Sequence, residues 1–138
     1  MFKSPEKYQP KKPEDEPEGK EGLQSAIQTL REVAEQFNVL DHEADNLFAK
    51  EDTTGCTEKL KERAQLLVDL PDRLASSLES VDQETREQIL RDVSYFATSA
   101  QEALENGGKF RLGVLLTSKG YKIGDKNDLE QLIDSLEG

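Results

Sequence analysis

Residues 23–37 read LQSAIQTLREVAEQF, and their apolar side chains recur at spacings of four, three, four and three residues. The residues that repeat in this way are Leu23, Ile27, Leu30, Ala34 and Phe37. Because an α-helix has 3.6 residues per turn, this spacing places the repeated side chains on one face. The stretch therefore predicts an amphipathic helix that buries this face against neighbouring helices.

Two interpretations are open for the residues that follow. The apolar phase continues to Ala44 and Phe48, which favours a single helix through Phe48. Asp41, however, falls on the apolar face, and Asn38 and Val39 are weak helix formers, so a break at 38–41 also fits. In either case Gly55 and the two threonines before it end the element.

Two more apolar stripes of helical spacing follow residue 55. The second contains Leu60, Ala64, Leu67, Leu74, Leu78 and Val81, and the third contains Ile89, Val93, Phe96, Ala100, Ala103 and Leu104. Pro71 stands where the second stripe needs its next member, so the helix either kinks there or ends near Leu70 and restarts. Gly107 and Gly108 are expected to stop the third helix.

Residues 107–126, here called the basic segment, interrupt an otherwise acidic chain. They carry Lys109, Arg111, Lys119, Lys122 and Lys126 against one acid, Asp125, for a net charge of +4. The whole chain has a net charge of −11, so the other residues sum to −15. Charge separated this sharply can orient a protein on a partner.

The conformation of the basic segment allows two interpretations. Phe110 to Leu116 fit a short helix that ends at Gly120, whereas alternating apolar residues would also suit a hairpin turning at Lys119-Gly120. We favour the helix, because Lys119 complements the negative end of the helix dipole and Gly120 is a natural residue just past a helix end. Asp125 or Asn127 then caps a last helix, whose apolar residues are Leu129, Leu132, Ile133 and Leu136.

These patterns predict an all-α protein, a mostly antiparallel helical bundle of four to six helices joined by short connections. Residues 22–138 are expected to form one domain. Residues 1–21 contain Pro5, Pro10, Pro13 and Pro17, with Phe2 and Tyr8 nearly their only large apolar groups. Such a segment buries too little apolar surface to offset its ordering entropy, so we expect a disordered N-terminal tail.

Composition excludes several classes of function. A net charge of −11 repels duplex DNA at long range, so we expect no nucleic-acid partner. The longest apolar runs are two or three residues, and the N-terminus has no apolar core of a secretory signal, so we expect neither a membrane span nor export. The single cysteine, Cys56, rules out an internal disulfide and fits a cytoplasmic location.

Candidate catalytic residues are few. Cys56 and His42 flank the same loop, so a Cys–His dyad is geometrically open, but no recognisable motif surrounds them. The expected role of Cys56 is that of a helix-start residue or a semi-buried thiol. His42 lies among carboxylates, yet no Glu stands three residues before it and there is no second His. We therefore predict no catalytic residue, no cofactor and no metal site.

The charge of the basic segment has two explanations. Its bases could pair with the bundle, since residues 23–106 carry 18 acids against 8 bases. Alternatively they could contact a partner, with aromatic side chains available to stack. The candidate partner-binding residues are Lys109, Phe110, Arg111, Lys119, Tyr121 and Lys122. We favour the pairing within the bundle, and an acidic protein over nucleic acid if the segment binds a partner.

The sequence thus predicts a non-catalytic helical protein–protein interaction module with an adaptor, regulatory or accessory role. It would dock through a helical face or through the basic segment, and regular amphipathic stripes also leave a homodimer open. Two alternatives come from other classes. One is a nucleic-acid-associated protein that uses the basic segment, and the other is a small enzyme with a carboxylate or Cys56 in an inter-helix cleft.

Overall fold

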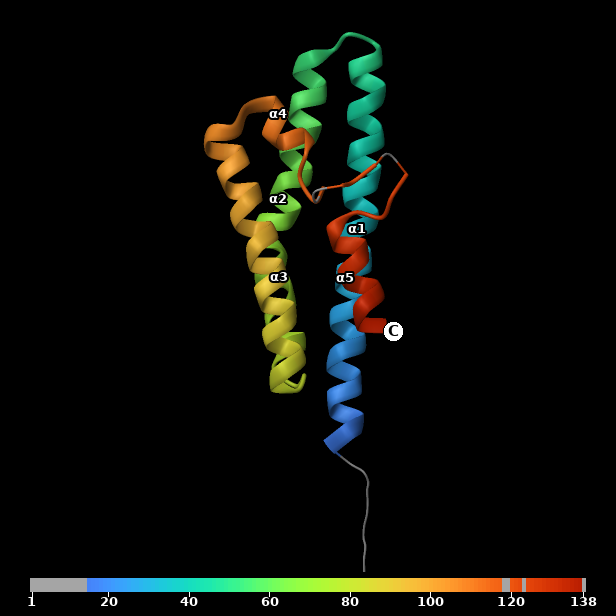
Figure 1. The fold of residues 1–138 in the computed structure, drawn as a ribbon, viewed down its shortest axis with the longest axis vertical. Coiled ribbons are helices and arrows are strands. Elements are labelled where there is room, and N and C mark those ends of the chain that lie inside the picture. The colour runs from blue at the N-terminus through green and yellow to red at the C-terminus, as the bar shows by residue number, and fades with distance from the viewer. Residues whose placement is uncertain (1–14, 118–119, 123, 138) are drawn as a thin grey trace, which may run out of the picture.

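The computed structural model describes residues 15–117, 120–122 and 124–137, and for residues 15–20, 107 and 109 it describes the backbone alone. These residues form five α-helices and one π-helical turn, with no strand (Figure 1). The elements are α1 (Asp15–Ala49), α2 (Thr53–Leu78), α3 (Gln83–Glu102), η1 (Ala103–Gly107), α4 (Gly108–Gly113) and α5 (Asp128–Glu137). Neighbouring long helices run in opposite directions, so the predicted antiparallel all-α bundle of four to six helices is confirmed.

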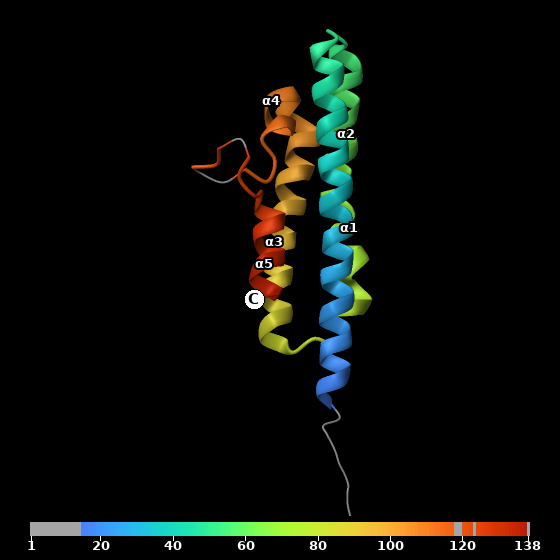
Figure 2. The same ribbon diagram turned by 90° about the vertical axis from the view of Figure 1, so that its right-hand side faces the viewer.

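The bundle has two layers. Helices α1 and α2 pack side by side in one layer (Figure 1), and Figure 2, in which these two helices overlap, shows α3, α4 and α5 on one side of it. The core between the layers contains most members of the predicted stripes, together with Val33 and Leu70, which the stripes did not include. Its largest fully buried side chains are Leu30, Val33, Leu67, Leu70, Leu74, Ile89, Val93, Leu112 and Leu129. Periodic apolar residues therefore face the interior of the bundle, as their spacing predicts.

Helix α1 extends beyond both ends of its apolar stripe, which runs from Leu23 to Phe48. It begins at Asp15, inside the segment expected to be a disordered tail, while residues 1–14 lie outside the described residues. Pro17 is tolerated there, because the first-turn amides of a helix have no hydrogen-bond partner within the helix. At the other end Phe48 is 58% exposed, so the stripe does not stay buried to its last member.

The predicted break at 38–41 is absent, because α1 continues through this stretch to Ala49. The reason lies in Asp41, the charged residue on the apolar face. Its carboxylate accepts a hydrogen bond from Arg63 of α2 at 2.5 Å, which satisfies the charge without ending the helix.

Helix α2 is likewise unbroken and runs through Pro71. The alternative in which one helix ends near Leu70 and another starts is therefore wrong. Leu70 and Leu74 on either side of the proline are fully buried. Packing on both sides of Pro71 thus keeps the chain helical where local preference favours an interruption.

The basic segment adopts the helical alternative, but the helix is shorter than predicted. After η1, Gly108 takes φ +64°, which turns the chain into α4, and α4 ends at Gly113 rather than at Gly120. Asn127 then caps α5. Its side chain accepts from the Glu130 amide and the Glu130 carboxylate accepts from the Asn127 amide, both at 2.9 Å. This reciprocal pair is a capping box, and it confirms Asn127 rather than Asp125 as the cap.

Gly22 marks a close approach of α1 to the end of α2. A Cβ atom at Gly22 would lie 2.8 Å from the Ser77 carbonyl oxygen and 2.2 Å from Ser80 Oγ. We expect Gly22→Ala to destabilise the protein by about 1–3 kcal/mol, because the backbone oxygen must move to accept the methyl group. Helix propensity alone predicts the opposite sign, a gain of about 1 kcal/mol. Chemical denaturation of both proteins measures the difference.

Gly113 supplies the control for this substitution. A Cβ atom at Gly113 meets no atom within 4 Å, so Gly113→Ala should be neutral or stabilising by up to about 1 kcal/mol. Equal stability of Gly22→Ala and the natural chain would show that α1 and the end of α2 do not approach as closely as described.

Candidate protein-interaction surface around α4

Arg63 of α2 anchors the short helix α4 to the bundle. Its guanidinium donates to the backbone carbonyl oxygens of Leu112 at 2.9 Å and Gly113 at 3.0 Å. These carbonyls stand at the end of α4, where a helix leaves its last acceptors unpaired. An isolated helix of six residues is not stable in water. The two hydrogen bonds from Arg63 and the burial of Leu112 therefore fix the position of α4.

The Arg63 side chain is 4% exposed and its charge is compensated from α1. The Asp41 carboxylate lies 2.5 Å from its Nη1, and the Phe37 ring lies under the guanidinium with its centroid 4.5 Å from Cζ. Burial lowers the pKa of Arg63 from its ordinary value, and the carboxylates of Asp41 and Asp45 offset part of that effect. Arginine stays charged under these conditions, so Arg63 joins α1, α2 and α4 as a buried cation.

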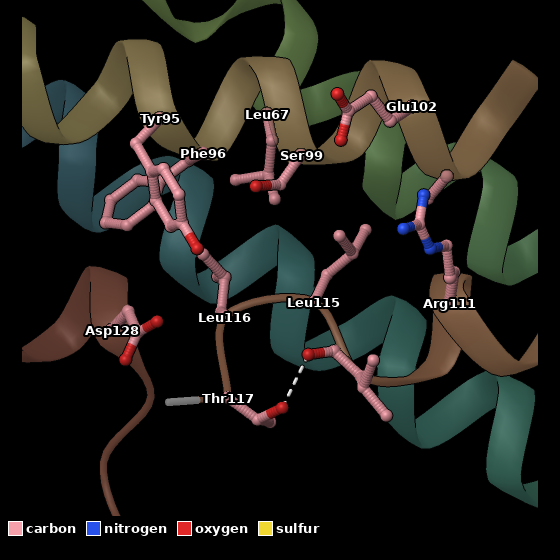
Figure 3. A pocket seen from close by; sticks show the side chains of 12 residues that line it. Leu67, Tyr95, Phe96, Ser99, Glu102, Arg111, Leu115, Leu116, Thr117 and Asp128 are labelled. Atoms are coloured by element: carbon pink, nitrogen blue, oxygen red, sulfur yellow. Dashed lines mark hydrogen bonds between the residues drawn. The ribbon is translucent and has the colours of Figure 1, made fainter. Parts of the chain in front are cut away.

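Two hollows open on either side of α4. The first, the α3-side hollow, has a volume of about 320 Å³ and is shown in Figure 3. Tyr95, Ser99 and Glu102 of α3 form one wall of it, facing Arg111 of α4 and Leu115 across the opening. Its lining combines apolar and charged side chains, which come from α2, α3, η1, α4, the turn after α4 and the start of α5.

The second hollow, the α1-side hollow, has a volume of about 450 Å³. Phe48 of α1, Leu60 of α2 and Phe110 of α4 are among its apolar lining residues, and Val114 lines both hollows. Asp41 and Asp45 add two carboxylates on the α1 side.

Exposed apolar side chains gather around these hollows. The described residues include seven exposed large apolar side chains, and four of them line the two hollows: Phe48, Tyr95, Phe110 and Val114. Phe110 is 79% exposed and Tyr95 is 67% exposed. Exposed apolar side chains gathered in one region make it the candidate interaction surface of the described residues. These four residues and Arg111 are called the α4 surface below.

The predicted partner-binding residues fall into three groups. Phe110 and Arg111 both belong to the α4 surface, but Phe110 lines the α1-side hollow and Arg111 the α3-side hollow. Tyr121 and Lys122 lie exposed in the connection to α5, and they are not among the described residues that line either hollow. The side chain of Lys109 and all of Lys119 lie outside the described residues.

The described ion pair of the basic segment is local. Lys126 contacts Asp134 of α5 at 2.6 Å, and this hydrogen bond raises the pKa of Lys126. This pair joins Lys126 to α5, and none of the ion pairs described for Arg111, Lys122 or Lys126 reaches the acids of residues 23–106. The expected pairing of the segment with those acids stays a prediction for Lys109 and Lys119. A separate link to the bundle uses a base of the bundle and not of the segment, since Arg63 donates to the carbonyl oxygens of Leu112 and Gly113.

Cys56 lies in the first turns of α2 and is 4% exposed, which agrees with its expected place at a helix start. It lines the α1-side hollow together with Asp41 and Asp45, whereas His42 is exposed on α1 and is not among the described lining residues. Within the described part of the chain, no three side chains of His, Cys, Asp or Glu gather where they could hold a metal ion.

Sequence reasoning missed Arg63, although a signal was present. Arg63 falls between Leu60 and Leu67 at helical spacing, so it is a charged residue at the edge of the second apolar stripe. Asp41 is likewise a charged residue on the apolar face of the first helix. Two opposite charges on two apolar faces indicate a partly buried ion pair if the helices pack together.

The geometry defines the class of protein as an antiparallel α-helical bundle with a short anchored helix flanked by two hollows. None of the described helices combines the length and the apolar character needed to cross a membrane. No family model, curated protein or solved structure matches this chain.

Proposed function

We propose that this protein is a non-catalytic protein–protein interaction module that acts in the cytoplasm and docks through the α4 surface. The observation that carries this function is the gathering of Phe48, Tyr95, Phe110 and Val114 around the two hollows. Aromatic residues and arginine are the types enriched at the centre of protein interfaces. The α4 surface offers three aromatic side chains and Arg111.

Anchoring of α4 supports this role. Arg63 holds the carbonyl end of α4, and Leu112 is 2% exposed, so Phe110 and Arg111 are presented from a positioned backbone. The α4 segment then loses less conformational entropy on binding a partner than an unanchored segment would.

Charge indicates the kind of partner. Arg111 and Lys122 are exposed, whereas the chain as a whole carries −11. A partner that inserts an apolar side chain into the α1-side hollow and carries acids opposite Arg111 would match this surface. The acidic remainder of the chain opposes a nucleic acid at the same place within a Debye length of about 10 Å.

Phe110→Ser tests this function. We expect the full chain to capture a partner from its native cell, and the purified partner to bind Phe110→Ser about thirtyfold more weakly, the typical cost of losing an interface hot spot. Phe110 is 79% exposed in the free protein, so its loss should change stability by less than about 0.5 kcal/mol.

Leu90→Ser is the matched control, because Leu90 is a second exposed apolar residue, on α3 and away from both hollows. It should leave binding unchanged. Equal affinity of the natural chain and Phe110→Ser, or equal losses in both variants, would contradict docking through the α4 surface.

A further inference from the structure

A groove runs between α1 and α2, with a volume of about 640 Å³ and lining residues from these two helices alone. Figure 2 shows α3, α4 and α5 on one side of the α1–α2 layer, and no described helix lies on the other side. Its lining residues span 35–43 on α1 and 59–69 on α2, which is about 12 to 15 Å of helix at 1.5 Å per residue. This length matches two to three turns of a partner helix.

The groove has an apolar centre. Val39, Leu40 and Leu66 line it, and Val39 is 52% exposed although it lies in the middle of α1. An apolar strip between two helices accepts the apolar face of an amphipathic helix, whose anchors recur three or four residues apart.

The borders of the groove are acidic. Four acids line it, Glu35, Glu43, Glu62 and Asp69, against the single base Lys59, for a net charge of −3. Lys59 bridges the two helices, with its Nζ 3.2 Å from Glu43 and 3.9 Å from Glu62. The hydrogen bond to Glu43 and the charges of both acids raise the pKa of Lys59.

We propose that the α1–α2 groove binds a basic amphipathic helix of a partner protein, with apolar anchors over Val39 and Leu66 and Lys or Arg residues along the acidic borders. Charge complementarity selects this occupant. A second copy of this chain would place the same four acids against themselves, because a two-fold interface pairs identical patches. The groove shares no lining residue with the α4 surface, so this inference does not rest on the function proposed above.

The test uses an 18-residue synthetic peptide of leucine and lysine with all leucines on one helical face. Fluorescence anisotropy of the labelled peptide should report saturable binding to the full chain, and a leucine–glutamate peptide of the same pattern should not bind. Val39→Gln should weaken binding at least tenfold, because it removes an apolar contact, while glutamine is a better helix former than valine and leaves the net charge unchanged. Unchanged affinity of Val39→Gln would overturn the inference.

Charge variants separate binding in the groove from general attraction to an acidic protein. Glu62→Gln with Asp69→Asn should weaken binding about tenfold, whereas Glu84→Gln with Glu87→Gln, the same charge change on α3, should alter it less than twofold. Lys59→Gln should tighten binding several-fold, because it makes the groove more negative. Equal losses in the two double variants, or weaker binding of Lys59→Gln, would overturn the inference.

Two further measurements check that the variants fold and locate the bound peptide. Circular dichroism and thermal melting should show each variant folded, and amide chemical shifts of the natural chain should change on peptide addition within 35–43 and 59–69. Shifts confined to α4 would place the peptide on the other surface and overturn the inference. A concentration-dependent dimer that Val39→Gln dissolves would do the same, by assigning the groove to a second copy.

Discussion

Arg63→Ala is expected to lower the free energy of unfolding by about 3 kcal/mol. The change removes charge-assisted hydrogen bonds to Asp41, Leu112 and Gly113, each worth about 1.5–3 kcal/mol, and part of this loss returns as water reaches the freed groups. It also leaves a cavity over the Phe37 ring, where the guanidinium lay. Urea denaturation followed by circular dichroism measures the effect.

The loss of stability in Arg63→Ala should be largest around α4. Arg63 is the described donor to the carbonyl end of α4, so amide hydrogen exchange should accelerate in residues 108–116 of Arg63→Ala more than in α3. Arg63→Lys should give an intermediate result, because an ammonium keeps the charge but cannot reach Asp41 and both carbonyls with one planar fork.

Arg73→Ala is the control, since Arg73 lies on the same helix but in an exposed ion pair with Glu32 at 3.7 Å. Exposed pairs contribute at most about 1 kcal/mol, so Arg73→Ala should change stability little. Similar losses in Arg63→Ala and Arg73→Ala would mean that Arg63 does not hold the bundle and α4 together.

Ile89→Ala should destabilise the protein by about 2–5 kcal/mol. Ile89 is fully buried in α3, where this helix packs on α2, and its truncation removes apolar burial and leaves a cavity that close-packed neighbours fill only in part. The measurement is the same denaturation experiment, with an unchanged slope against urea as the sign that only stability has altered.

Leu90→Ala provides a comparison one residue away. Leu90 is 38% exposed, so its truncation should cost less than about 1 kcal/mol, and alanine also favours the helix. If the two substitutions cost the same, the rotation of α3 about its own axis would differ from the one described.

The apolar periodicity predicted the helices and their buried faces well. Ile27, Leu30, Leu67 and Ile89 are buried because residues three or four apart share a face in any helix, whatever it packs against. Local signals were less reliable at the helix ends and at Pro71. There the competing structures differ by about 1–3 kcal/mol, an amount that tertiary packing can override.

The candidate site was predicted in part. Phe110 and Arg111 were recognised from their place in the basic segment, and both lie on the α4 surface. Phe48 was placed on the continuing apolar stripe of the first helix, and Tyr95 lies outside the predicted stripes. Neither pattern indicates an exposed surface, because each residue becomes part of one only when a second helix packs beside it. A hollow belongs to several helices at once, and no single stretch of sequence contains it.

By itself the sequence determined the helical class of this protein, the buried face of each long helix and the acidic balance with one basic segment. These depend on spacing along one chain and on composition. Only the tertiary structure decided that α1 and α2 are continuous, that Asp41 and Arg63 meet, and that α4 is held between two hollows. Those outcomes depend on contacts between residues 22 to 50 positions apart, whose energies exist only once the helices pack.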